Sequence, residues 1–251
     1  MLTQVIWIST IVLEALIFFR GVRGKLLAEF PAFYVYIGYI LVEETARFIA
    51  FHSKFYPQVY WDSQFVSLLV GCGIIFEFYR TGLKAFPGTA HMARNVLLVV
   101  FALVFAKGIV TSAEGTSWLA ALTAMKLELD LRIVQSCSLV ALLLVFSVYA
   151  IPLSRNLKGV ILGYGIFLGT SVIQLTAMLL LGEVFTGPWP YVRSVAYLSV
   201  LIVWAATLWV REEAPKAAHN ITLDEDYNML VANTRRRFQK TRLALGKVVR
   251  P

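Results

Sequence analysis

The sequence predicts an all-α polytopic membrane protein: a seven-transmembrane-helix bundle with the N-terminus outside and the C-terminus cytoplasmic. The first observation is composition, since 59% of the 251 residues are hydrophobic and only 15% are charged, against about 25% charged in soluble chains. One core of this size cannot hide so much apolar surface, so the surplus must face lipid. The other two observations are seven long apolar runs and an uneven distribution of Lys and Arg between them. This composition excludes a cytosolic enzyme, a disordered protein and a secreted disulfide scaffold.

Each apolar run is long enough to cross about 30 Å of hydrocarbon as a helix. The runs cover residues 2–19, 33–51, 62–79, 93–111, 129–150, 157–181 and 192–210. The first run is predicted to be a retained helix, because it lacks the preceding basic segment and the small-residue cleavage site of a signal peptide. The chain therefore divides into a bundle over residues 1–210 and a tail over residues 211–251.

Orientation follows from the basic residues in the connections, which accumulate on the cytoplasmic side of membrane proteins. With the N-terminus outside, the inner side receives 17 Lys and Arg, and the outer side receives only Lys54, Lys126 and Arg193. Without the nine basic residues of the tail, the ratio is still eight to three. In the outer connection before the fifth run, the stretch 118–125 is predicted to lie along the membrane interface as a short helix.

The second run carries three charged residues, Glu43, Glu44 and Arg47. A charge at the centre of a membrane helix costs about 2.5 to 3.5 kcal/mol on insertion scales, so such residues are functional candidates. Arg47 follows Glu43 by four residues and Glu44 by three, and both spacings allow an ion pair on one helix face. Arg47 can satisfy one carboxylate, and the other needs a second partner or a proton. The group is either a structural lock within the bundle or a ligand, ion or proton site.

Further polar residues are expected at the same depth as Arg47. If they point inward, they line an outward-facing polar pocket together with the charges of the second run. Lys107 can instead extend to the outer interface. Glu77 and Arg80, at a cytoplasmic helix end, are expected to form an interfacial salt bridge. The additional residues of the predicted pocket are Lys107, Asp130, Arg132, Gln135 and Gln174, with Thr170 beside them.

Several kinds of chemistry are excluded. His52, His91 and His219 all lie away from the centres of the runs, so a pair of axial haem ligands is absent, and no Cys/His cluster indicates zinc or copper. The seventh run contains no lysine to which retinal could be attached. No Walker-type Gly-Lys-Ser/Thr loop occurs, and no Ser-His dyad lies within reach of a membrane surface. We therefore expect no enzyme activity, no metal and no cofactor.

Four glycines of the sixth run form two pairs with a spacing of four residues, on or near one helix face. The pairs are Gly159 with Gly163 and Gly165 with Gly169. This small-xxx-small pattern is typical of helices that approach each other closely, within one chain or between protomers of a homo-oligomer.

The tail is predicted to contain an amphipathic helix over about residues 222–248. Thr222 and Glu225 have the spacing of a capping box, and the acidic residues precede the basic ones, as the helix dipole favours. Apolar and small residues recur at alternating spacings of four and three from Tyr227 to Val248, which allows a weak coiled-coil seam. The alternative, which we prefer, is a helix on the anionic lipids of the inner leaflet, with no nucleic acid as partner.

The whole chain resembles, in architecture, uncharacterised bacterial seven-helix integral membrane proteins and the seven-helix N-terminal input modules of some bacterial histidine kinases and cyclases. The resemblance rests on the outside N-terminus, the seven spans and a cytoplasmic helix that leaves the last span at Arg211. It implies a protein of the bacterial inner membrane. In those relatives the exit helix leads to an output domain, and here the chain stops at Pro251, so transmission would need a separate signalling partner.

These observations are compatible with functions of different classes. The first is a membrane sensor that binds a ligand in the outward-facing pocket and signals through a separate partner. The second is a proton- or ion-coupled transporter or channel, and the third is a structural subunit of a membrane complex. A transporter is expected to have paired Gly/Pro breaks in its helices, and no run has a central proline, which favours the sensor.

Overall fold

The computed structural model describes residues 2–50, 53–54, 56–113, 117–181, 189–212 and 223–248. All regular secondary structure within these ranges is helical, and they contain no strand, which confirms the predicted all-α class. The helices are α1 (Leu2–Arg23), α2 (Leu26–Glu29), α3 (Pro31–Ala50), α4 (Tyr56–Gly82), α5 (Pro87–Ala113), α6 (Ser117–Val148), α7 (Arg155–Leu181), α8 (Trp189–Leu208) and α9 (Leu223–Val248).

Five segments of these helices are long and apolar enough to cross a membrane. They are Val5–Arg23, Ser63–Gly82, Pro87–Val110, Met125–Val148 and Arg155–Leu181. The two other long helices of the bundle differ from these five in length or composition. α3 has 20 residues and carries three charges, and the apolar part of α8, Val192–Leu208, belongs to the shorter class of 10 to 17 residues.

The helix bounds differ from the expected ones in two places. α6 is a single helix of 32 residues that begins at Ser117, so the range 118–125 is the first part of α6 and not a separate interfacial helix. The short helix α2 was not expected, and it turns the chain between α1 and α3. Thr222, the first residue of the predicted capping box, lies outside the described residues.

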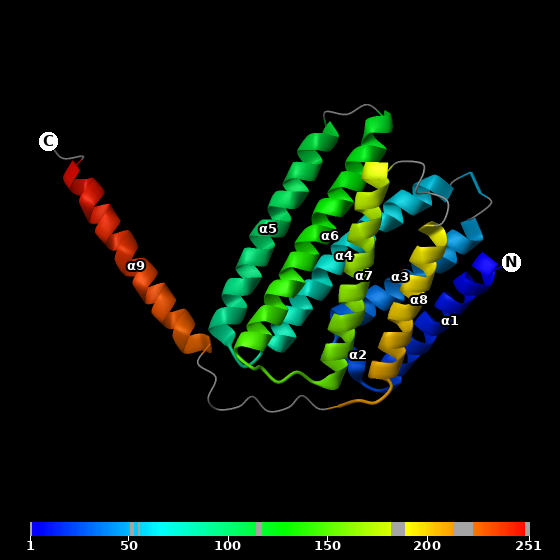
Figure 1. Cartoon of the computed structure of the whole chain (residues 1–251), viewed down its shortest axis with the longest axis horizontal. Helices are drawn as coiled ribbons and strands as arrows, with labels where there is room; N and C mark the ends of the chain where they lie inside the picture. Colours follow the sequence, from blue (N-terminus) through cyan, green and yellow to red (C-terminus); the bar gives the residue numbers. More distant parts are fainter. Residues whose placement is uncertain are drawn as a thin grey trace.

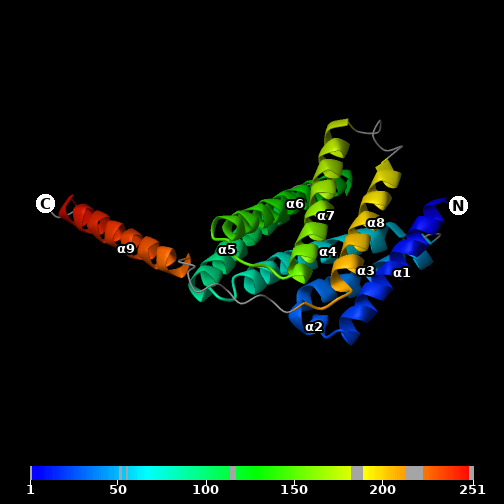
Figure 2. The ribbon, with the colours of Figure 1, turned by 60° about the horizontal axis from the view of Figure 1, so that its bottom comes forward.

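Six helices form a closed ring, in which each packs against the next in the order α1, α3, α4, α6, α7 and α8, and α8 packs against α1. We call this set the six-helix ring. α5 packs on the outside of this ring, against α4 and α6 (Figure 1). α9 contacts α5 and otherwise points away from the bundle in both views (Figure 1 and Figure 2). α9 is attached there by the buried Leu223 and by the Tyr149 hydroxyl, which donates to Asp226 at 3.1 Å.

Close helix contact in the ring depends on two of the four glycines. A Cβ on Gly163 would overlap the indole of Trp204, and one on Gly159 would overlap Thr207, so both glycines lie at the α7–α8 contact. A Cβ on Gly165 would make only ordinary contact with α6, and a Cβ on Gly169 would meet nothing within 4 Å. The predicted close approach is therefore confirmed for the first pair of glycines and not for the second.

The end of the bundle opposite the N-terminus is closed by hydrogen bonds to helix ends. Arg20 donates twice to the carbonyl of Trp209, at 2.9 and 2.6 Å, just beyond the end of α8. Asn156 at the start of α7 donates to the carbonyls of Thr207 and Val210, at 3.0 and 2.9 Å. These bonds satisfy carbonyls that the last turn of a helix leaves without intrahelical donors. They fix α1, α7 and α8 to one another at this end.

Glu77 caps α3 at the same end. Its two carboxylate oxygens accept hydrogen bonds from the backbone N–H groups of Ala32 and Phe33, at 2.7 and 2.9 Å. These N–H groups belong to the first turn of α3, where they have no intrahelical acceptor and where the helix dipole favours a negative charge. The expected Glu77–Arg80 salt bridge is not among the ion pairs of the described residues. The Glu77 carboxylate instead accepts the two hydrogen bonds from the α3 backbone.

Candidate functional site

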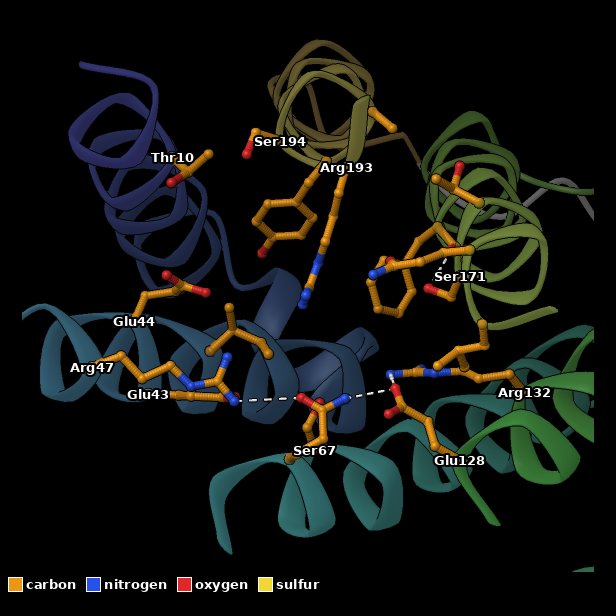
Figure 3. A pocket seen from close by; sticks show the side chains of 18 of the residues that line it. Thr10, Glu43, Glu44, Arg47, Ser67, Glu128, Arg132, Ser171, Arg193 and Ser194 are labelled. Carbon is orange, nitrogen blue, oxygen red and sulfur yellow. Dashed lines mark hydrogen bonds and ion pairs between the residues drawn. The ribbon is translucent and has the colours of Figure 1, made fainter. Parts of the chain in front are cut away.

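A cavity of about 520 Å³ lies inside the six-helix ring, towards the end of the bundle where α1 begins (Figure 3). All six helices of the ring contribute to its lining, and α5 contributes none of the described lining residues. Its volume is within the range of about 300 to 1,000 Å³ that is typical of small-molecule sites. The charged residues of the lining are Glu43, Glu44, Arg47, Glu128, Arg132 and Arg193.

The α3 wall of the cavity contains the buried ion pair between Glu43 and Arg47. The two residues are four positions apart, so they share one helix face, as the spacing predicts. Arg47 also donates from Nη2 to the Ser63 hydroxyl at 2.8 Å and to Gln64 at 3.4 Å, both on α4. This arrangement joins α3 to α4, and it leaves Oε2 of Glu43 buried with no hydrogen-bond partner among the described residues.

Glu44 points in a different direction from Glu43, because successive residues of a helix are about 100° apart. Its Oε2 accepts a hydrogen bond from the Trp7 indole N–H of α1 at 2.5 Å. Within the described ranges Glu44 takes part in no ion pair. Its carboxylate is therefore on the cavity wall, and among the described residues it accepts one hydrogen bond from a neutral donor and forms no ion pair.

The opposite wall is built by α6. Gln64 donates to Glu128 at 2.6 Å, so a chain of contacts runs from Arg47 through Gln64 to Glu128 (Figure 3). Arg132 is only 2% exposed, yet its contacts are long: 3.7 Å to the Glu128 carboxylate and 3.5 Å to Gln135. Its Nε has no partner among the described residues. The guanidinium carbon lies 4.7 Å from the centre of the Phe167 ring, which covers one face of the group.

Tyr36 of α3 also lines the cavity, and this residue is 0% exposed to solvent. Its hydroxyl has no hydrogen-bond partner among the described residues. Buried polar side chains almost always have partners, so each exception needs a reason. Tyr36, Glu43 and Arg132 are three such exceptions among the described residues that line this cavity.

The remaining wall consists of α7 and α8. Ser171 and Thr170 donate to carbonyls of their own helix at 2.8 Å, which leaves their oxygens able to accept. Arg193 extends from α8 into the space between Glu44 and Arg132 (Figure 3). Tyr197 lines the cavity and donates at 2.6 Å to Glu14, a fully buried carboxylate on α1.

The structure brings together five of the eight residues predicted for the pocket. Glu43, Glu44, Arg47, Arg132 and Gln174 line the cavity. Gln135 does not line it: it is fully buried behind Arg132, where it donates to Cys72 at 3.4 Å and accepts from Tyr164.

Lys107 and Asp130 also lie outside the cavity. Lys107 donates to Asp130 at 2.5 Å, and their side chains are 65% and 35% exposed. Lys107 is on α5, which packs outside the six-helix ring. A residue of α5 can therefore lie at the same membrane depth as the cavity without reaching the cavity. The sequence indicates the depth of such a residue and not its position around the bundle.

Several lining residues were not predicted. Glu128 had a signal in the sequence, since it precedes Arg132 by four residues, as Glu43 precedes Arg47. Arg193 was counted only as a basic residue of a connection. Trp7, Tyr36 and Gln64 gave no signal, because an aromatic or amide residue in an apolar helix is as common in a core as in a site.

The described residues contain no group of three or more His, Cys, Asp or Glu that could hold a metal ion. No protein-family model, no curated protein and no solved structure gives a significant match to this chain. The function must therefore be inferred from the geometry of the cavity.

Proposed function

We propose that this chain is a seven-span membrane sensor that binds a small polar ligand in the cavity and signals through a separate partner. The observation that carries this proposal is the set of three buried polar side chains on the cavity wall with unpartnered atoms. A purely structural lock would be expected to satisfy these groups internally. A ligand that forms hydrogen bonds with these groups would bind more tightly, because the groups are already buried and ordered and little free energy is lost in ordering them on binding.

The proposed topology places the cavity on the outer side of the bacterial inner membrane. At the cavity end, the basic residues in the connections and adjoining helix ends are Lys54, Lys126 in α6 and Arg193 in α8. The other end and the tail together contain 17. Cytoplasmic connections are enriched in Lys and Arg, so the cavity end is the outer one. In this topology α3 and α8 complete the seven spans, and the charges of α3 face the cavity and α4 rather than lipid.

Signalling would use the contrast between the two ends of the bundle. The inner ends of α1, α7 and α8 are tied by hydrogen bonds, whereas their outer halves surround the cavity. A ligand that contacts α3, α6 and α8 together would favour one relative arrangement of these helices over another. The chain continues from α8 through residues 209–222 to α9, the segment that would act on a separate partner, as in the input modules that the sequence resembles.

One observation favours the second candidate, a proton-coupled transporter. Glu14 is a fully buried acid that reaches the cavity through its hydrogen bond from Tyr197. Intramembrane acids of this kind occur in proton relays. Proton flux measured with a pH-sensitive dye in proteoliposomes separates the two: the sensor gives no ligand-dependent flux, and a transporter gives flux that Glu14→Gln abolishes.

The proposed function is tested by a thermal-unfolding screen of small polar metabolites against the protein in nanodiscs. We expect at least one compound to raise the unfolding temperature of the wild-type protein. Ser171→Trp, which fills the cavity, should abolish this stabilisation. Ser199→Trp is the matched control, because Ser199 is an exposed residue of α8 outside the cavity, and it should keep the response. A screen without any stabilising compound, or an equal response of both variants, would contradict the proposal.

A further inference from the structure

The described part of the cavity wall is balanced in formal charge, with three arginines and three glutamates. Placing a net charge in a buried site is costly unless a counter-charge is already present. A ligand that carries both signs would leave this balance unchanged. The distribution of the charges therefore matters more than their sum.

Three of the charged side chains already have close polar partners in the cavity wall. Glu43 is paired with Arg47, and Arg47 is bonded to α4. Glu128 accepts a close hydrogen bond from Gln64. Arg193 extends into the space between Glu44 and Arg132 (Figure 3). Of these two residues, Glu44 accepts only from Trp7 among the described residues, and Arg132 has a long hydrogen bond to Gln135 at 3.5 Å and a long ion pair with Glu128 at 3.7 Å.

Arg132 and Tyr36 together provide a subsite for an anionic group. Both are almost completely buried, both line the cavity, and the guanidinium Nε and the phenol hydroxyl have no partners among the described residues. The Phe167 ring covers one face of the guanidinium and has an edge-to-face contact with the Tyr36 ring at 6.3 Å. The Nε group then has no partner among the described residues, and Nη2 is only loosely paired with Glu128 at 3.7 Å. The edge formed by Nε and Nη2 matches the two oxygens of a carboxylate.

Glu44 provides a subsite of the opposite sign. Its carboxylate lies beside α1, across the cavity from Arg132 (Figure 3). The Trp7 N–H occupies one of its oxygens, and a carboxylate has about four acceptor positions, enough for an ammonium group as well. Because the two subsites are on different walls, the charges of a ligand that reaches both must be separated by several bonds.

We infer that the cavity selects a small zwitterion, such as an ω-amino acid or a dipeptide, with its carboxylate at Arg132 and Tyr36 and its ammonium group at Glu44. This inference rests on the proposed function, because it names the ligand class of the same cavity.

The inference is tested with three probes of equal chain length: 5-aminopentanoic acid, pentanoate and pentylamine. Binding is measured by calorimetry on the full chain in nanodiscs. We expect 5-aminopentanoic acid to bind at least about tenfold more tightly than either probe with a single charge, since each lacks one charge-assisted hydrogen-bond set. If pentanoate or pentylamine binds as tightly as the zwitterion, the inference is wrong.

Two conservative variants assign the subsites. Glu44→Gln should weaken binding of 5-aminopentanoic acid and bring it to the level of pentanoate. Tyr36→Phe should weaken the binding of both carboxylate probes without lowering the unfolding temperature, because the lost hydroxyl has no partner among the described residues. Tyr34→Phe is the matched control: its hydroxyl is also buried and unpartnered, but Tyr34 does not line the cavity, so binding should not change. Equal effects of the two tyrosine variants would overturn the assignment of Tyr36.

The outcome separates this inference from the function on which it rests. If none of the three probes binds, while the metabolite screen finds another compound whose effect Ser171→Trp abolishes, the ligand class is wrong and the sensor proposal stands. If neither the probes nor the screen gives a ligand, both are wrong.

Discussion

At the scale of single residues, the Glu43–Arg47 pair has a testable energetic role. Arg47→Ala should leave a buried carboxylate without its cation and lower the free energy of unfolding by about 3 to 5 kcal/mol. Combining it with Glu43→Gln removes the stranded charge, so much of this loss should be recovered. Unfolding in SDS titrations measures both variants. A double variant as unstable as Arg47→Ala would show that Glu43 is not the relevant partner, and that the bonds from Arg47 to α4 dominate.

The cap of α3 gives a second prediction at this scale. Glu77→Ala removes the acceptor for two backbone N–H groups and should cost about 1 to 3 kcal/mol of unfolding free energy. Arg80→Ala is the control, and it should cost less than about 1 kcal/mol, as surface charges usually do. If the two substitutions destabilise the protein equally, Glu77 acts through Arg80, as the sequence alone had suggested, and not through α3.

A third residue-scale prediction concerns pH and the attachment of α9. The hydrogen bond to the Asp226 carboxylate raises the pKa of the Tyr149 phenol. A raised pKa in the attached state means that this contribution is complete below the ordinary tyrosine pKa of about 10 and is lost as pH rises through the raised value. A spin label at Val231 on α9 should therefore become more mobile at strongly alkaline pH. In Tyr149→Phe the label should be equally mobile at neutral and alkaline pH.

Residue pairs within one helix were predictable, and partners on other helices were not. The spacing of Glu43 and Arg47 indicates their pair, because helix geometry alone brings positions four apart together. The spacing of Glu77 and Arg80 indicates a pair for the same reason, but the α3 backbone competes for that carboxylate. Sequence spacing carries no information on such competition between helices.

At the scale of elements, the α7–α8 contact depends on the absence of a side chain at Gly163. Gly163→Leu should destabilise the protein by at least about 1 to 3 kcal/mol, because the side chain must displace Trp204. Gly169→Leu is the same change on the same helix where nothing lies within 4 Å, so it should have little effect on unfolding. Leu162→Ala, at a residue 58% exposed, should also be mild. Equal unfolding temperatures of the two glycine variants would contradict a specific role for Gly163.

The existence of the long helices could be predicted, and some of their limits could not. Apolar length predicts a helix in each of the seven runs, because an unpaired backbone cannot be exposed to hydrocarbon. It does not predict where α6 begins, since the helix extends to Ser117 through a stretch that is only mildly apolar. Nor does it predict that α5 lies outside the six-helix ring, because both inner and peripheral membrane helices are apolar.

At the scale of the whole molecule, the proposed topology predicts labelling of single cysteines in intact cells by a membrane-impermeant maleimide. Ser53→Cys, in the connection between α3 and α4, should be labelled from outside. Lys84→Cys, between α4 and α5, should be labelled only after the cells are opened. Both residues are exposed. The background carries Cys137→Ser and keeps the buried Cys72. The reverse pattern would place the cavity on the cytoplasmic side.

The hydrogen bonds at the end opposite the cavity make α1, α7 and α8 levers with their pivots far from the cavity. A helix of 27 residues such as α7 is about 40 Å long, so a tilt of about 5° about a fixed inner end displaces the other end by about 3.5 Å. The same tilt hardly translates the inner end, which instead rotates in place. In the proposed sensor, distances between labels near the bound ligand should therefore change by several ångström, and a cytoplasmic partner would detect a change of helix angle.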